Sequence, residues 1–391
     1  MIELSPKLRE VFLESARLAG EWYANTQNTE ASPWGGVHDS ADVGRYIYEY
    51  FVTRQWARGN GVWGQAVAIM GLMTLERRVP SGGRYSVSAT LAGNYLKSLQ
   101  IINPTDEKCH GGFREHTPQD DWSYPRDGAT GGMGFCALYK ETKKEEYLDR
   151  ARIFGAWYHK YGSDANGWPH VQFSFSKRVP ERVGEFQPGD WQAGGALVYY
   201  WLGKLTGEKH WMDYFRQIVD PLTGMLERNT GKPEIRDFHG KSEVTYGNND
   251  FSTIVMIAAW RQWRDMRMLD ALRGYLHRLW EVQDADGTYP SFGGTFVATM
   301  SDMEYLQLCR EEKLKEDLPA LEERIVRAAK ATLLQQETLL RDIRAYGGYY
   351  GQSNFGVSRE RIHQRSTGYG MIMNLRLVGG AETPYYSSWG W

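Results

Sequence analysis

The chain has 391 residues, with Lys+Arg 46 against Asp+Glu 48, so its formal net charge at pH 7 is −2. Because no dense basic run appears, neither nucleic acid nor an anionic membrane surface is expected as a partner. No apolar run reaches the roughly 18 residues that a membrane span requires, and the N-terminal segment lacks the features of a secretory signal. We expect a soluble protein, cytoplasmic as given and secreted if a signal peptide has been removed.

The cysteine and aromatic contents further restrict the class of protein to which the chain can belong. Three cysteines are widely spaced and odd in number, which argues against a disulfide framework or a structural zinc site. The chain carries 15 Trp and 24 Tyr. This density indicates a large aromatic core or a surface that stacks on flat apolar faces, of which sugar rings are the commonest for a protein without nucleic-acid charge.

Amphipathic and apolar segments alternate along the chain. The first amphipathic helix is expected over 5–26, and the aromatic and β-branched residues 44–52 fit a strand or an additional inner helix. Apolar helices of three to four turns then follow residues 61, 128, 191, 250, 294 and 366, while amphipathic helices are expected over 84–100, 144–161, 208–228, 265–283 and 319–341. No shift in composition marks a domain boundary, so the prediction is one domain, 1–391.

This alternation predicts the fold. A helix that is apolar nearly all round must be enclosed, whereas a one-sided helix can form an outer wall. Six such pairs predict an all-α protein, an (α/α)6 toroid with an inner ring of helices inside an outer ring, or seven pairs if 44–52 is helical. The many small residues of the apolar helices permit close packing.

Each apolar helix begins at a junction rich in polar residues or glycine. The six junctions are ARGNG (57–61), YPRDG (124–128), QPGDW (187–191), YGNND (246–250), YPSFGG (289–294) and IHQRS (362–366). In a toroid they would lie at one rim with the long loops 27–60, 101–128, 162–190, 229–250 and 342–365. Asn, Asp and Ser are also preferred capping residues, which is the simpler interpretation of Asn248, Asn249, Asp127, Asp190 and Ser366. If these residues instead converge on one cavity, they would line its base with polar groups surrounded by aromatic side chains.

The chain resembles the (α/α)-toroid carbohydrate-active enzymes, which include alginate and glucuronan lyases and the unsaturated glucuronyl and rhamnogalacturonyl hydrolases. ARGNGVWGQAVAIMGLM (57–73) is similar to a helix start of the rhamnogalacturonyl hydrolases, although it stands earlier in the chain than theirs. VHDSADVG (37–44) resembles the His-Asp of the glucuronyl hydrolases. YGNND is similar to the Asn-rich helix start of toroid lyases, with Asp250 where a His often follows.

The resemblance implies a polysaccharide lyase that cleaves a uronate-containing glycan of the alginate or glucuronan class by β-elimination. Amide, His and Arg donors neutralise the substrate carboxylate, so that the C5 proton can be removed, and a tyrosine can serve as base. The expected catalytic residues are Tyr246, His110, Asn249 and Arg365. The expected substrate-binding residues are Asn248, Arg126, His363, Trp191, Trp122, Asn60 and Arg58. Each of these expected site residues could also have a structural role alone, as an aromatic side chain of the core, a histidine of a loop or the partner in an ion pair.

Two other functions stay open. A glycoside hydrolase acting on uronyl oligosaccharides would need carboxyl groups, one with a raised pKa. Asp127, Asp190 and Asp250 are its candidates, with Asp39, Asp42 and Glu115 behind them. A non-catalytic glycan-binding toroid would use the Trp-rich loops alone. Neither a cofactor nor a metal is expected, since the histidines lack HxH or HExxH spacing. The expected partner is an acidic polysaccharide or oligosaccharide, and the oligomeric state stays open.

Overall fold

The computed structural model describes residues 2–29, 42–182, 189–228, 250–289, 294–353 and 356–379. Within these ranges two kinds of helix alternate, as the hydrophobic pattern predicts. The inner helices are α2 (Val62–Arg78), α4 (Pro125–Thr142), α6 (Gly189–Thr206), α8 (Asp250–Trp263), α10 (Gly294–Glu312) and α12 (Gln364–Gly379). The outer helices are α1 (Pro6–Thr26), α3 (Arg84–Leu99), α5 (Glu145–Trp157), α7 (Lys209–Arg228), α9 (Met266–Glu281) and α11 (Leu318–Leu333).

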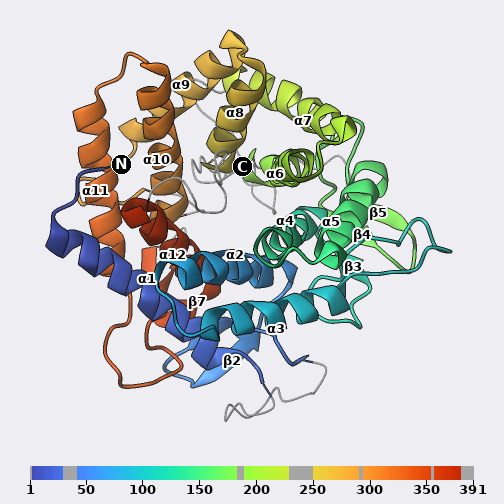
Figure 1. Cartoon of the computed structure of the whole chain (residues 1–391), viewed down its shortest axis with the longest axis horizontal. Coiled ribbons are helices and arrows are strands. Elements are labelled where there is room, and N and C mark those ends of the chain that lie inside the picture. The colour runs from blue at the N-terminus through green and yellow to red at the C-terminus, as the bar shows by residue number, and fades with distance from the viewer. Residues whose placement is uncertain are drawn as a thin grey trace.

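The inner helices form a closed ring. Each packs against the next, from α2 through α4, α6, α8 and α10 to α12, and α12 packs back on α2 (Figure 1). The inner helices from α2 to α10 each contact the outer helix that follows in the chain, whereas α12 is covered by α1. The two ends of the chain thus complete the last pair, and the predicted (α/α)6 toroid is confirmed with six pairs.

Burial explains which helices lie inside. In α2 every residue from Val62 to Leu75 is buried except Trp63, whereas α9 buries a one-sided stripe that runs from Met268 to Leu279. Small residues let the inner helices approach closely, because a Cβ added at Gly134 would lie 2.9 Å from the Cβ of Ala66. No α-helix in the described ranges has both the length and the apolar character needed to cross a lipid bilayer.

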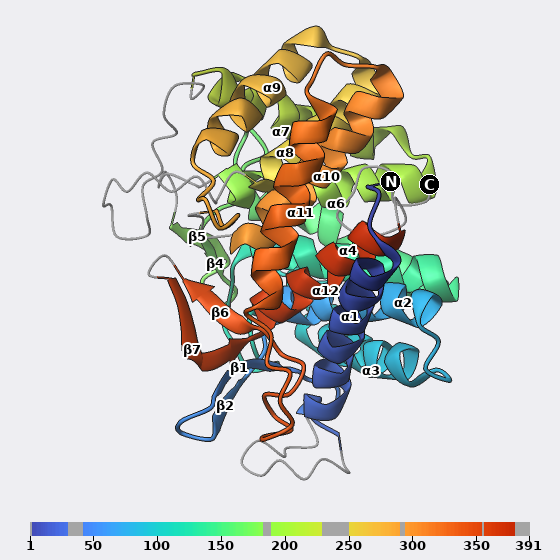
Figure 2. The same ribbon diagram turned by 90° about the vertical axis from the view of Figure 1, so that its left-hand side faces the viewer.

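Two small sheets lie at one end of the toroid, which the sequence did not predict. The larger has the order β2-β1-β7-β6, with β1 at Ile47–Phe51, β2 at Trp56–Gly59, β6 at Tyr350–Ser353 and β7 at Gly356–His363. The smaller has the order β3-β4-β5, with β3 at Trp122–Ser123, β4 at Gln172–Ser174 and β5 at Val179–Arg182. In Figure 2 the two sheets lie on the left-hand side of the helices. The segment 44–52 therefore contains a strand, and the alternative of a seventh helix pair is wrong.

Each inner helix begins within its predicted junction or at the residue after it. Because one outer helix returns the chain between successive inner helices, the inner helices run in the same direction and begin at one rim. The helix predicted over 144–161 is α-helical to Trp157 and continues as a π-helical turn, Tyr158–Gly162. One predicted helix end was too late: α11 ends at Leu333, and Gln336 turns back to hydrogen-bond α1 at Ser15.

Candidate functional site

Two carboxyl groups meet between the starts of α2 and α4. The carbonyl oxygen of Glu115 accepts a hydrogen bond of 2.9 Å from the backbone N–H of Val62, the first residue of α2. Its side chain accepts one of 2.8 Å from the N–H of Tyr124, the N-cap of α4. A Cβ at Gly61 would lie 2.6 Å from the Glu115 carbonyl oxygen, so only glycine leaves room for this approach. Glu115 is therefore fixed to the starts of two neighbouring inner helices.

The Glu115 carboxyl group lies against that of Asp127, in the first turn of α4. Burial raises the pKa of Glu115 well above its usual value, and the charge of Asp127 and a hydrogen bond with it raise that pKa further. Glu115 is 3% exposed, whereas the Asp127 side chain is partly exposed and pairs with Arg126 at 3.0 Å. The pair thus consists of a buried carboxyl group behind one that reaches the surface.

An aromatic and basic group lies beside this pair. The ring of Tyr48, in β1, lies 4.8 Å from that of His363 at the end of β7, and the guanidinium group of Arg58, in β2, lies 5.6 Å from its centroid. The charges of Arg365, Asp127 and Arg58 all act on the Tyr48 hydroxyl, although burial is the main cause of its raised pKa. Tyr48 therefore lies between α12, α4 and the sheet.

The start of α12 supplies a histidine and an arginine. His363 accepts a hydrogen bond of 3.0 Å at Nδ1 from the backbone N–H of Arg365, and its Nε2 lies 3.6 Å from Glu49. Burial first, and then the charges of Arg361 and Arg365, hold the pKa of His363 well below its usual value. The Arg365 guanidinium group lies 5.8 Å from the ring centroid of Trp63 in α2. His363 is consequently a neutral histidine at physiological pH.

A second histidine, His116, lies within reach of the charge of Asp127. The ring of His116 is 5.5 Å from that of Trp122 in β3. Its pKa is lowered, chiefly by burial, and the charges of Arg58 and Asp127 also act on it. These contacts join three starts of inner helices and both sheets into one group, which we name the rim cluster: Tyr48, Glu49, Arg58, Trp63, Glu115, His116, Trp122, Arg126, Asp127, Arg361, His363 and Arg365.

The rim cluster contains seven of the side chains that the sequence singles out. These are Arg58, Glu115, Trp122, Arg126, Asp127, His363 and Arg365. Asn60 lies next to the cluster, two residues after Arg58, and is almost fully buried, with no hydrogen-bond partner for its Nδ2 among the described residues. His110 lies elsewhere in its loop, where its Nδ1 accepts a hydrogen bond of 3.0 Å from the N–H of Asn103.

The side chains of seven further candidates lie outside the described residues. Tyr246, Asn248 and Asn249 lie outside the described residues, as does Asp39. Asp190, Trp191 and Asp250 fall in the first turns of α6 and α8, but their side chains lie outside the described set. The roles of all the predicted site residues therefore stay predictions.

Some members of the cluster were missed or ranked low from sequence. Tyr48 and Glu49 stand in a segment for which the sequence predicts only a strand or a helix, and His116 is not among the expected site residues. Glu115 ranked below the aspartates because it does not begin a helix. The sequence signal for Glu115 and His116 was their place between Gly111-Gly112 and YPRDG, in a loop that leads to an inner helix.

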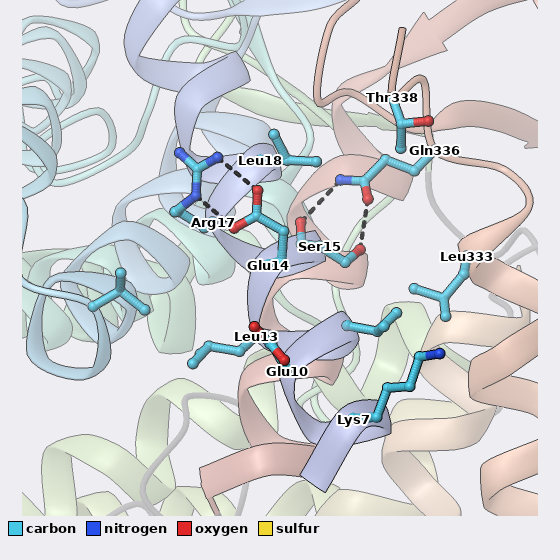
Figure 3. Close-up of a pocket in the computed structure, with 12 residues that line it drawn as sticks. Lys7, Glu10, Leu13, Glu14, Ser15, Arg17, Leu18, Leu333, Gln336 and Thr338 are labelled. Carbon is cyan, nitrogen blue, oxygen red and sulfur yellow. Dashed lines mark hydrogen bonds and ion pairs between the residues drawn. The ribbon is translucent and has the colours of Figure 1, made fainter.

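A separate groove runs along the outer surface of α1. Its volume is about 550 Å³, and Figure 3 shows Lys7, Glu10, Glu14 and Arg17 of α1 around it, with Leu333, Gln336 and Thr338 on the other side. None of its lining residues belongs to the rim cluster. In the described part of the chain, no three His, Cys, Asp or Glu side chains are grouped as metal ligands.

Comparison with known proteins supports the fold. No protein-family profile matches the chain, and no curated protein matches its sequence. The structure is similar to cellobiose 2-epimerase from Bacillus thermoamylovorans, with a TM-score of 0.70 and 13% identity over 94% of this chain and 99% of that one. It is also similar to a family 76 α-mannanase from Bacteroides thetaiotaomicron, with a TM-score of 0.66 and 14% identity over 94% and 95% of the two chains.

A third similar structure is a family 88 glycosyl hydrolase from Bacteroides vulgatus, with a TM-score of 0.57 and 13% identity over 82% of this chain and 92% of that one. All three similar proteins process carbohydrates, by their names. At such low identities the likeness establishes the fold, and a shared fold does not fix the chemistry. The chain is an (α/α)6 toroid whose fold it shares with carbohydrate-active enzymes.

Proposed function

We propose that this protein is a glycoside hydrolase whose general acid is Asp127. The observation that carries the proposal is the buried Glu115 carboxyl group behind Asp127, with its raised pKa. Two carboxyl groups in contact cannot both ionise easily, so the pair retains a proton at a pH where an ordinary glutamic acid has lost it. Asp127 is the partly exposed member and can pass this proton to a glycosidic oxygen.

The pair supplies one side of the reaction only. Hydrolases place their two carboxyl groups about 5–5.5 Å or about 6.5–9.5 Å apart, on opposite sides of the bond, whereas Glu115 and Asp127 are close enough for Asp127 to act directly on the Glu115 carboxyl group. The second catalytic group must therefore come from another part of the rim. Asp190 and Asp250, at the starts of α6 and α8, are the candidates that the sequence provides.

The predicted acidic substrate belongs to this proposal. At neutral pH the rim cluster holds four arginines against Glu49 and the one negative charge of the Glu115–Asp127 pair, because this pair retains a proton and both histidines are uncharged. This excess of positive charge favours an anionic sugar. The similar proteins named as a family 76 α-mannanase and a family 88 glycosyl hydrolase give glycan hydrolysis a precedent on this fold, beside the cellobiose 2-epimerase.

β-Elimination of a uronate is the second candidate. It is favoured by the pairing of His363 with Arg365 at the start of α12, which matches the carboxylate-neutralising set that the chemistry requires. Its proposed base, Tyr246, and the amides Asn248 and Asn249 lie outside the described residues. Tyr48 is a poor substitute as base, because burial raises its pKa.

One set of incubations tests the proposal. Alginate, glucuronan, polygalacturonate, cello-oligosaccharides and α-mannan are incubated with the wild-type protein, and the products are examined in three ways. New reducing ends without absorbance of a C4–C5 double bond indicate a hydrolase, and that absorbance indicates a lyase. A new sugar isomer without chain cleavage would indicate an epimerase and contradict both candidates, and binding without any product would indicate a glycan-binding toroid.

A further inference from the structure

One face of the larger sheet carries two rows of side chains. Residues that pair across antiparallel strands point to the same side of the sheet, and so do alternate residues of one strand. Glu49 of β1 pairs with Arg58 of β2 and with His363 of β7, and all three belong to the rim cluster. Two residues further along β1, Phe51 pairs with Trp56. This second row therefore lies on the same face as the first, about 7 Å closer to the turn of the hairpin.

The opposite face of the sheet packs against the rest of the protein. Tyr50 pairs with Ile362 there, both side chains are fully buried, and the Tyr50 hydroxyl group donates a hydrogen bond to Asp342. The hairpin of β1 and β2 is thus held in place from this side, and the row of Phe51 and Trp56 is on the other. In Figure 2 the hairpin projects at the lower left of the molecule.

Trp56 is the exposed member of the second row. It is 53% exposed, and no other Trp, Tyr or Phe of the described residues is even half exposed. Its ring lies 5.5 Å from that of Phe51, which is partly buried, and the two rings are inclined by 38°. We name Trp56 and Phe51 the aromatic platform. It offers a flat apolar surface of the kind that a sugar ring can cover.

The surface between the proposed acid and the aromatic platform is continuous. The charges of Asp127 and Arg58 both act on the hydroxyl group of Tyr48, so these three residues lie close together. Arg58 and Trp56 are alternate residues of β2, and both are exposed. A glycan chain that lies at Asp127 and continues past Arg58 along the sheet would therefore reach Trp56.

We propose that the aromatic platform is an outer subsite of the glycan-binding site, on which a sugar ring stacks when the bound chain extends from the rim cluster along the sheet. The contact is with the apolar face of the sugar, because Arg361, which also pairs with Phe51, is engaged with Glu49 at 2.7 Å. The aromatic platform therefore selects for the length of the glycan rather than for its charge. This inference rests on the proposed function, since it takes the rim cluster as the place of cleavage.

Binding of short and long sugars tests this subsite without turnover. The probes are the disaccharide and the hexasaccharide of each of the five glycans in the product assay. Their affinities are measured by calorimetry on the full chain carrying Asp127→Asn, so that no sugar is cleaved. At least one hexasaccharide should bind more tightly than its disaccharide. Trp56→Ala should weaken the binding of that hexasaccharide about tenfold and leave that of the disaccharide unchanged, whereas Trp56→Phe should lose less because a flat ring remains.

Arg54→Ala is the matched control, because Arg54 is exposed in the turn of the same hairpin. It should bind both sugars as the parent does, and circular dichroism should show that all variants are folded. The proposal is overturned if no hexasaccharide binds more tightly than its disaccharide, or if Trp56→Ala weakens both sugars equally. It is also overturned if Arg54→Ala or Trp56→Phe has the same effect as Trp56→Ala.

Sedimentation without sugar separates stacking on a glycan from a contact between copies of the chain. Trp56→Ala should leave the oligomeric state unchanged, and loss of an oligomer in this variant would assign the indole to such a contact and contradict the proposal. Because the readout of the subsite is affinity, a failure of the hydrolase proposal would show separately, as absence of products with the wild-type chain.

Discussion

Glu115 lies directly behind Asp127 and links this proposed acid to the starts of two inner helices. Its backbone carbonyl oxygen binds the start of α2 and its side chain binds the start of α4. Burial of the Glu115 carboxyl group and the charge of its neighbour Asp127 both disfavour its ionisation. Two neighbouring carboxyl groups that share one proton hold it to a higher pH than an isolated carboxyl group does. The pair therefore sets the pH range over which the site can donate a proton.

Glu115→Gln should narrow that pH range. Glutamine keeps the shape, can accept the hydrogen bond from Tyr124 and can donate one to Asp127, which stabilises the ionised form of Asp127. The alkaline limb of the profile of kcat/KM against pH should therefore move to lower pH, while activity at acid pH falls less than in Asp127→Asn. The measurement is kcat/KM from pH 4 to 9 on a substrate identified by the product assay. An unchanged alkaline limb would mean that Glu115 serves only to hold the loop.

Asp302, in α10, should make folding stability depend on pH. It is fully buried, accepts hydrogen bonds of 2.7 Å from Trp280 Nε1 and the Tyr289 hydroxyl, and burial raises its pKa to about 6. Because the folded-state pKa lies above the unfolded value of 3.8, the stabilisation is complete below about pH 4 and is lost as the pH rises through about 6.

Asp302→Asn provides the measurement. Asparagine can still accept from Trp280 and can donate to the Tyr289 hydroxyl, but it does not titrate. The free energy of unfolding of the wild type relative to the variant should be highest near pH 4. It should fall by an amount on the order of 3 kcal/mol by pH 7, since one pH unit corresponds to about 1.4 kcal/mol. A constant difference across this range would contradict the prediction.

Ser15 should contribute to closing the ring. Its hydroxyl group hydrogen-bonds Gln336 Oε1 at 2.6 Å and the Tyr349 hydroxyl at 2.5 Å, and it accepts a bond of 3.1 Å from Asn374 Nδ2 in α12. Ser15→Ala leaves these buried groups with fewer partners and should lower the free energy of unfolding by about 1–3 kcal/mol. Ser98→Ala is the control, because that hydroxyl bonds only the Tyr95 carbonyl within α3. Equal effects of the two changes would contradict a role in closure.

The helix pattern could be predicted from sequence because it depends on local burial. Inner helices such as α2 are apolar on every side and outer helices such as α9 on one, and this difference is visible in the residues themselves. The pairing of β1 with β7 has no such signal, since it joins Glu49 to His363 across most of the chain. The sheets that bring Tyr48 and Arg58 to the site could therefore not be foreseen.

The candidate site was predicted in part for the same reason. The polar junctions at helix starts pointed to Asp127, Arg126 and Arg365, which the structure brings into one cluster. They could not separate His110 from His116, because only the path of the loop directs one to Asn103 and the other to Trp122. Glu115 acquires its properties from burial by distant segments. A raised pKa of this kind is a property of the fold rather than of the local sequence.

The most direct test of the account is the turnover of Asp127→Asn on the substrate that the wild-type chain cleaves. Asparagine fills the same space and can still contact Arg126, but it has no proton to give. We predict that release of new reducing ends falls by about 10²–10⁴-fold, while the circular dichroism spectrum and the affinity for the sugar remain close to those of the wild type. Near-wild-type turnover in Asp127→Asn, with loss of activity in Tyr246→Phe, would contradict the account and assign the chemistry to β-elimination.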